Sequence, residues 1–377
     1  MKKTLPHLND TGDQPQRGWS RLAIICLLLS HFYPAIAQID TTAINLSISA
    51  YAEPYYGYDL NQPADNNRPG FVYAHNRHNE FNVNIAFVKA SLNAQRMRGN
   101  LALMAGTYAN ANLAAEPKTL QNVLEANAGV KLAKNHELWV DAGIFASHIG
   151  YESAVGKDCW TLTRSILADN SPYYESGAKI SYTTADGNWF FSALALNGWQ
   201  RIQRVPGNSA LSGGWQITVT PSAQVTLNSS GFVGTDKPDS SRLNRIFHNF
   251  YGIFQISDQL GLTLGFDSGW EESPRAGEDA SWWYSPVIIG RYAFSDRVAL
   301  AGRVEYYSDK NGVLIATGTE NGFQTLGISA NLDVQMHKNA LWRIEGKWFN
   351  SKDEIFLKDN NLSKSNAVIT TALAVWF

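Results

Sequence analysis

Charged side chains recur at every second position in several alternating segments of the chain. Arg303 and Glu305 are two residues apart, and Arg343, Glu345 and Lys347 follow the same spacing. Because successive side chains of a strand point to opposite faces, charges with this spacing lie on one face. Charges of both signs along a water-filled space set a preference among ions and small polar solutes. The pattern therefore predicts an electrostatic role for these residues; the alternative is that they only pair across neighbouring strands.

The same parity places further charged residues on the polar face of the predicted strands. They are Arg98, Glu125, Lys131, Asp141, Lys179, Asp267 and Asp333. Both signs are represented, so the sequence predicts a polar face of mixed charge.

A second concentration of charge lies in residues 150–174, one of the longest predicted links between strands. It contains Glu152, Lys157, Asp158 and Arg164, together with Trp160. A link that folds into the space enclosed by the strands narrows it, and its charges then meet passing solutes. Arg164 is the predicted cation of such a constriction. The alternative, that this run packs the link against the wall, is left open by the sequence.

The histidines form no recognisable catalytic or metal-binding arrangement. Ser147 and His148 are neighbours, but successive strand residues face opposite sides and cannot form a nucleophile–base pair. No G-x-S-x-G elbow occurs. His75, His78 and Glu80 lie in a link rich in Asn and Arg, where a hydrogen-bonded loop is the better interpretation. We therefore predict no enzymatic activity, no metal and no cofactor.

The elements that position these charges are alternating segments of about ten residues, the length that a tilted strand needs to cross a bilayer. In residues 326–334, apolar side chains alternate with Gly, Ser, Asn and Asp. Aromatic residues near segment ends match the interfacial girdles of membrane barrels; they include Tyr292, Phe294, Tyr306, Trp342 and Trp348. These girdles count against the alternative of a soluble antiparallel sheet with one wet face.

Long and short polar links alternate along the chain, as outer loops and periplasmic turns do in outer-membrane barrels. This alternation predicts an all-β fold, a transmembrane antiparallel up-and-down barrel of about 16 strands. Residues 215–220 are weakly patterned, so about 14 or 18 strands are alternatives. A barrel of about 16 strands leaves an aqueous channel, whereas about eight strands are filled by side chains.

The beginning of the chain is typical of an export signal. Residues 22–30 (LAIICLLLS) are an apolar core, and residues 35–37 (AIA) a small-residue cleavage site. We predict a cleaved signal peptide over residues 1–37 and one barrel domain over residues 38–377. Cys26 leaves with the signal, so Cys159 has no intrachain partner. The net charge of −2 argues against nucleic acid as a partner.

Five runs of residues carry a resemblance to a known family. They are SAYAEPYYGYDLN (49–61), RHNEFNVN (77–84), LALMAGTYA (101–109), SHIGYE (147–152) and WTLTRSILADNSPYYESG (160–177). These runs resemble the β-barrel porin-2 family of outer-membrane proteins, also called OmpL-like. The resemblance implies an outer-membrane barrel that acts as a porin, without an established substrate and without catalytic residues.

The last segment, residues 367–377, alternates and stops on Phe377. This ending resembles the recognition signal of barrel-assembly machinery, and we expect the segment to close the barrel by pairing with residues 44–52. Together these features predict a multi-pass channel of the bacterial outer membrane, surrounded by its lipids, through which small hydrophilic solutes or ions diffuse. A homotrimer is the candidate assembly. The alternative is a closed or loop-plugged barrel with a structural, adhesive or surface-binding role.

Overall fold

The computed structural model describes residues 44–377 except positions 276 and 360. The chain divides into two units, and all the described residues belong to the second, Ile44–Phe377. The predicted signal peptide, residues 1–37, lies outside the described residues, and so does its cleavage site. No helix in the described part of the chain is both long and apolar enough to cross a membrane.

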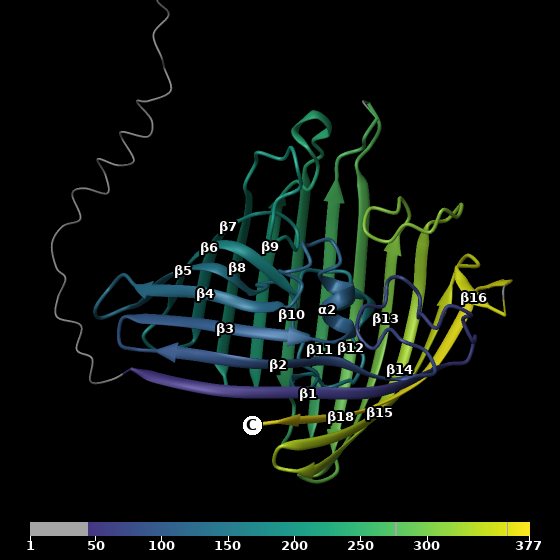
Figure 1. The fold of residues 1–377 in the computed structure, drawn as a ribbon, viewed down its shortest axis with the longest axis horizontal. Coiled ribbons are helices and arrows are strands. Elements are labelled where there is room, and N and C mark those ends of the chain that lie inside the picture. The colour runs from purple at the N-terminus through teal and green to yellow at the C-terminus, as the bar shows by residue number, and fades with distance from the viewer. Residues whose placement is uncertain (1–43, 276, 360) are drawn as a thin grey trace, which may run out of the picture. The chain divides into compact units, whose positions relative to one another are not determined.

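Sixteen antiparallel strands of the described chain form one closed barrel (Figure 1). The wall strands are β1 (Asn45–Asp59), β2 (Phe81–Asn93), β3 (Met97–Ala105), β4 (Val123–Lys131), β5 (Glu137–Ala146), β6 (Tyr174–Thr183), β7 (Trp189–Leu196), β8 (Ser212–Ser222), β9 (Val225–Gly234), β10 (Arg245–Gln255), β11 (Leu260–Glu271), β12 (Ser281–Ala293), β13 (Val298–Asp309), β14 (Phe323–His337), β15 (Ala340–Ser351) and β18 (Ser365–Trp376). The predicted fold class and strand number are confirmed, and the weakly patterned residues 215–220 lie within β8.

Long and short links alternate between these strands, as predicted. The long links hold four short helices and one hairpin: α2 (Thr107–Asn112), η2 (Gly156–Asp158), α3 (Ile166–Asp169), η3 (Asp239–Ser241), and the pair β16 (Phe356–Lys358) and β17 (Asn361–Ser363). We call residues 60–80, 147–173, 310–322 and 352–364 loops L1, L3, L7 and L8. The opposite end of the barrel, where the links are short, is called the short-turn end.

The last strand closes the barrel against the first. Tyr51 pairs with Trp376 and Asp59 with Val368, so β18 lies beside residues 51–59. The predicted partner, residues 44–52, belongs to the correct strand, but most of the pairing lies further along it, at residues 51–59. The stagger that a closed barrel requires slides neighbouring strand ends past each other, and residues 45–49 pair with β2 only. Phe377 continues the ladder by exchanging backbone hydrogen bonds with Ala50 (3.1 and 3.3 Å).

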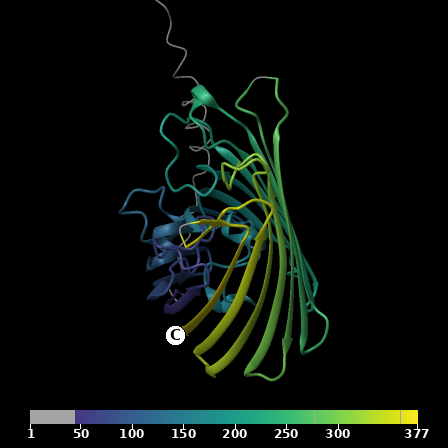
Figure 2. The same cartoon turned by 90° about the vertical axis from the view of Figure 1, so that its right-hand side faces the viewer.

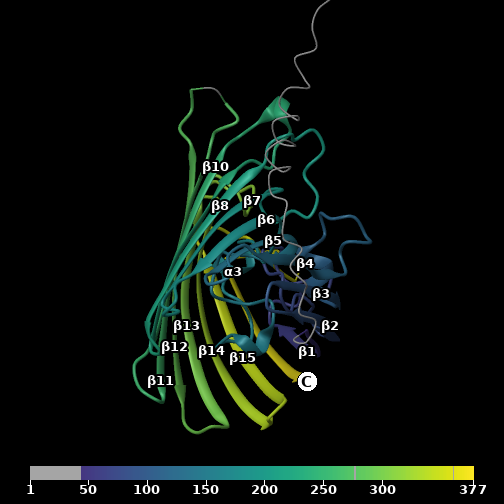
Figure 3. The same ribbon diagram turned by 90° about the vertical axis from the view of Figure 1, so that its left-hand side faces the viewer.

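Side chains alternate between the two faces of the wall as the period of two predicts. On β13, Arg303 and Glu305 are buried inside the barrel, while the neighbouring Val304 is half exposed on the outside. Large apolar side chains cover the outer face around the barrel, as a surface in contact with lipid requires. The chain thereby places its charged residues around one enclosed interior, into which α3 of L3 projects (Figures 2 and 3).

Candidate functional site

Loop L3 folds into the barrel and binds the inner face of three strands through its backbone. The amide of Leu162 donates to Asn331 on β14 (3.1 Å). The amide of Thr163 donates to Glu345 on β15 (2.5 Å), and that of Ile166 to Glu305 on β13 (2.6 Å). Loop amides that point at fixed carboxylates hold the loop in one position. L3 is therefore part of the barrel interior.

The charges beneath L3 form a buried network. Arg303 contacts Glu345 (2.9 Å), Glu305 (3.5 Å) and Glu152 of L3 (3.5 Å). Lys347 contacts Glu305 at 2.8 Å, and every side chain of the network is at most 4% exposed. Glu152 also accepts the backbone amide of Ser165 in L3. We call the part of the inner faces of β13–β15 that carries this network the sealed wall, because L3 separates these charges from water.

Arg343 fastens the tip of L3 to the same wall. Its guanidinium is held by Asp333 on β14 (2.7 Å) and donates to the carbonyls of Gly156 (2.7 Å) and Cys159 (2.9 Å). The structure thus brings together seven of the predicted residues at one side of the interior: Glu152, Arg303, Glu305, Asp333, Arg343, Glu345 and Lys347. Pairing across neighbouring strands, the predicted alternative, describes Arg343 with Asp333, whereas Arg303 and Glu305 of β13 reach Glu345 and Lys347 two strands away. L3 takes part in the network through Glu152.

Arg164 lies within L3 and does not face open space. Its side chain is 1% exposed, and its guanidinium donates to the carbonyls of Ser153 (2.6 Å), Leu162 (2.7 Å) and Ala154 (3.3 Å). A guanidinium with three carbonyl partners shapes the loop that surrounds it. This placement favours the packing alternative for Arg164 over the role of constriction cation.

Lys157 and Asp158 are the exposed part of L3. They pair at 2.6 Å, with side chains 30% and 50% exposed. Both line two cavities of about 410 and 340 Å³, one beside β1 and β2 and one beside β12–β15. The tip of L3 thus separates two wet spaces at the short-turn end, and these two residues are accessible from both.

The inner faces of β2–β5 differ from the sealed wall, and we call them the open wall. Lys89 pairs with Glu125 (2.8 Å), with side chains 25% and 17% exposed. Arg98 pairs with Asp141 (2.7 Å), with side chains 33% and 9% exposed. Three of these charges were placed inside by parity. Lys89 was not among the residues predicted to face the interior, although the apolar Val88 and Ala90 on either side of it show the same alternation of apolar and polar side chains.

The ring of Trp139 extends the open wall toward the short-turn end. The Arg98 guanidinium carbon lies 4.3 Å from its centroid, and the Lys131 ammonium 5.9 Å. Lys131 in turn pairs with Glu137. The open wall is therefore a ladder of cations and carboxylates that water can reach.

Two clusters of apolar side chains occupy part of the interior. One cluster joins Ile85 and Met104 of the wall to Tyr108 and Leu113 near α2. Another joins Phe71 of L1 to wall residues; these include Leu196, Phe232, Phe247, Trp283, Phe323 and Phe349. Constrictions lined by apolar side chains gate pores by expelling water. The two clusters therefore narrow the interior where α2, L1 and the wall meet.

The titratable groups of the loops have structural partners. His148 shares its ring nitrogens between Glu175 (2.9 Å) and the carbonyl of Gly231 (2.9 Å), and no ring nitrogen is left to act as a base. Burial lowers the pKa of His148, but the Glu175 carboxylate outweighs this effect, so the pKa is raised. Burial raises the pKa of Asp169 in L3 to about 7, against the opposing charges of Lys347 and Arg164. Among the described residues, no group of three His, Cys, Asp or Glu could hold a metal ion.

The closed barrel and its charged interior define an outer-membrane porin fold. The chain belongs to the family described as "Putative beta-barrel porin-2, OmpL-like", which matches residues 45–377. It is a multi-pass β-barrel of the bacterial outer membrane, as predicted. A search of curated proteins gives no match.

Solved porin structures share the fold at low sequence identity. The outer-membrane expressed OmpT of Vibrio cholerae has a TM-score of 0.58 and 10% identity, over 90% of this chain and 99% of that one. The anion-selective porin from Comamonas acidovorans has a TM-score of 0.58 and 8% identity, over 89% and 100%. The Salmonella typhi OmpF complex with daunomycin has a TM-score of 0.57 and 10% identity, over 88% and 97%. At these identities the likeness concerns the fold alone.

Proposed function

We propose that the protein is a passive channel for small hydrophilic solutes or ions in the outer membrane. The observation that carries this proposal is the open wall, where ion pairs of both signs keep part of their surface in water. Such a surface favours polar over apolar solutes and needs neither cofactor nor energy source. In this account solutes pass beside β2–β5, while L3 occupies the space along β13–β15.

The predicted site residues divide between two roles in this proposal. Lys157 and Asp158 meet solutes at the tip of L3, because their side chains are exposed. The buried set positions L3 and sets the width of the passage; it comprises Glu152, Arg164, Arg303, Glu305, Asp333, Arg343, Glu345 and Lys347. A porin with these roles has no enzymatic activity.

Conductance across a planar bilayer tests the proposal. Purified protein inserted into the bilayer is expected to produce stepwise increases in current, one for each channel. A membrane that stays tight, although inserted barrels are verified by heat-modifiable electrophoretic mobility, contradicts the proposal.

The second candidate is a closed or loop-plugged barrel with a structural, adhesive or surface-binding role. The observation in its favour is the apolar filling between α2, L1 and the wall. The same recording separates the two candidates, because a plugged barrel carries no current. Deletion of α2 then opens a plugged barrel, whereas a working channel conducts before the deletion.

Partners follow from the same account. OmpT of Vibrio cholerae has also been solved in a trimer form, with a TM-score of 0.55 to this chain, which supports a homotrimer. Lipid covers the apolar outer face. Phe377 is exposed at the end of the closing strand, where barrel-assembly machinery can bind it.

A further inference from the structure

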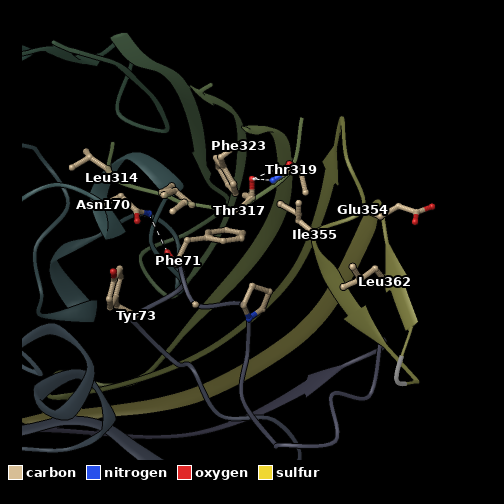
Figure 4. Close-up of a pocket in the computed structure, with 14 residues that line it drawn as sticks. Phe71, Tyr73, Asn170, Leu314, Thr317, Thr319, Phe323, Glu354, Ile355 and Leu362 are labelled. Atoms are coloured by element: carbon tan, nitrogen blue, oxygen red, sulfur yellow. Dashed lines mark hydrogen bonds between the residues drawn. The ribbon is translucent and has the colours of Figure 1, made fainter. Parts of the chain in front are cut away.

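A cavity of about 430 Å³ lies at the long-loop end of the barrel, apart from the charged interior (Figure 4). Its walls come from L1, the end of α3 in L3, L7 and L8. We propose that this outer cavity binds a small uncharged molecule that combines an apolar ring with a hydroxyl group. The inference goes beyond the proposed channel, because binding here does not require that the barrel conducts.

The floor of the cavity is aromatic and rigid. Phe71 and Phe323 meet edge to face with ring centroids 4.7 Å apart, and Phe349 and Phe356 pack behind Phe71 at 5.5 and 6.2 Å. Phe71 is 7% exposed and Phe323 is fully buried, so neither ring is free to move away. Leu362 remains 59% exposed beside them. A ligand ring gains most from covering Leu362 and the small exposed part of Phe71, since Phe323 has no exposed surface to offer.

Hydrogen bonds hold the walls in place without a ligand. The Asp309 carboxylate accepts the backbone amides of Val313, Leu314 and Ile315 at 2.9, 2.7 and 2.9 Å, which fixes the L7 side of the cavity. Asp353 of L8 accepts two hydrogen bonds from Asn321 of L7, both 2.9 Å. A preformed cavity binds a ligand more tightly than a cavity whose walls the ligand must order. The conformational entropy of the walls is then lost on folding and not on binding.

L1 is tied to L3 at the same cavity. The side-chain amide of Asn170 donates to the carbonyl of Phe71 (3.0 Å) and to the carbonyl of Ile166 in α3 (2.8 Å). All four loops around the cavity are thus fastened, and its volume lies in the range of small-molecule sites, about 300–1,000 Å³.

The polar groups of the cavity select an uncharged ligand with a hydroxyl. Thr317 and Thr319 share a hydrogen bond at 2.9 Å and can extend it to a ligand oxygen. The Tyr73 hydroxyl has no hydrogen-bond partner among the described residues. Glu354 is the one ionisable residue besides Tyr73 in the described lining, and Figure 4 shows its carboxylate directed away from Phe71. A charged ligand would lose hydration without gaining an ion pair.

Saturation-transfer NMR with 2-phenylethanol tests the inference on the protein folded into lipid nanodiscs. Signal transfer to the aromatic protons is expected above that from empty nanodiscs. Two filling substitutions, Thr317→Trp and Ala316→Phe, are expected to abolish the difference, because each occupies the cavity. Glu320→Trp is the matched control, since it adds the same ring to L7 outside the lining residues and should keep the wild-type signal.

The outcomes that overturn the inference are equally definite. Signal no greater than from empty nanodiscs, or unchanged in both filled variants, excludes binding in this cavity. Phenylacetate, which carries a charge, is expected to give a weaker signal than 2-phenylethanol. Equal signals overturn the assignment of an uncharged ligand. Conductance is measured on the same preparation, so failure of the channel proposal is recorded separately.

Discussion

The sealed wall and the open wall use the same side chains in different surroundings. On the sealed wall, Arg303 and Glu345 pair at 2.9 Å with neither side chain exposed. On the open wall, Arg98 and Asp141 pair at 2.7 Å, and a third of the arginine side chain remains in water. A buried pair that loses one partner leaves a charge without hydration, whereas water compensates an exposed one. Strand parity therefore determines that a charge faces the barrel interior. Contact with L3 determines whether that charge is buried or accessible to water.

The largest expected effect on the free energy of unfolding comes from a substitution in the sealed wall. Arg303→Met leaves Glu152, Glu305 and Glu345 without their shared cation, and we expect it to lower the free energy of unfolding by roughly 3–5 kcal/mol. Lys89→Met on the open wall is the control, since the Glu125 that it leaves keeps 17% of its side chain exposed, and it should cost about 1 kcal/mol or less. Urea unfolding in detergent micelles measures both. Equal losses of unfolding free energy in the two variants contradict the distinction between the sealed wall and the open wall.

The next effect concerns the fold of L3 itself. Arg164→Gln removes a guanidinium that serves three carbonyls, and we expect a loss of roughly 1–3 kcal/mol with the reversal potential unchanged. Unfolding and bilayer recordings on the same variant measure the two quantities. A shifted reversal potential with full stability points instead to Arg164 as a constriction cation.

A smaller effect is expected on the pH dependence of the free energy of unfolding, through Asp169 of L3. The raised pKa of Asp169, about 7, means that the folded protein keeps a proton that the unfolded chain releases near pH 4. Stability from this group is therefore complete below the unfolded pKa and is lost as pH rises toward 7. Asp169→Asn, which mimics the protonated acid, should make the unfolding midpoint independent of this group between about pH 4 and pH 7, the window between the unfolded and folded pKa values. If the unfolding midpoint of Asp169→Asn changes with pH as steeply as that of the wild type, the pH dependence does not come from Asp169.

The smallest change in free energy is expected on the open wall, together with a change in selectivity. Lys89→Glu replaces a cation that faces water, so the reversal potential in a salt gradient should move toward cation preference, less so at high salt. Lys118→Glu, an exposed substitution outside the wall strands, is the control for net charge. Equal shifts in both variants remove Lys89 from the solute path.

Much of the barrel could be predicted from the sequence because it depends on local patterns. The period of two places Arg303 and Glu305 inside, and alternating link lengths give the strand number. The burial of these charges by L3 could not be predicted. It depends on contacts such as the Thr163 amide with Glu345, 182 residues apart, and the Ile166 amide with Glu305, 139 residues apart. No local spacing encodes such pairs, so the length of L3 suggested entry into the barrel but not which charges it covers.

The outer cavity escaped sequence analysis for the same reason. Phe71 and Phe323 are each one aromatic residue in a loop or at a strand end, and only the closed barrel brings their rings to 4.7 Å. Asp309, the last residue of β13, accepts three consecutive backbone amides of L7, a role that no local spacing predicts.

Thiol block of the current tests most directly whether solutes pass beside the open wall. Lys89→Cys and Lys347→Cys are compared in a Cys159→Ser background, with a charged methanethiosulfonate reagent added during bilayer recording. We expect the reagent to reduce the conductance of the Lys89→Cys channel and to leave that of Lys347→Cys unchanged, because L3 covers position 347. Block at position 347 without block at position 89 contradicts the account.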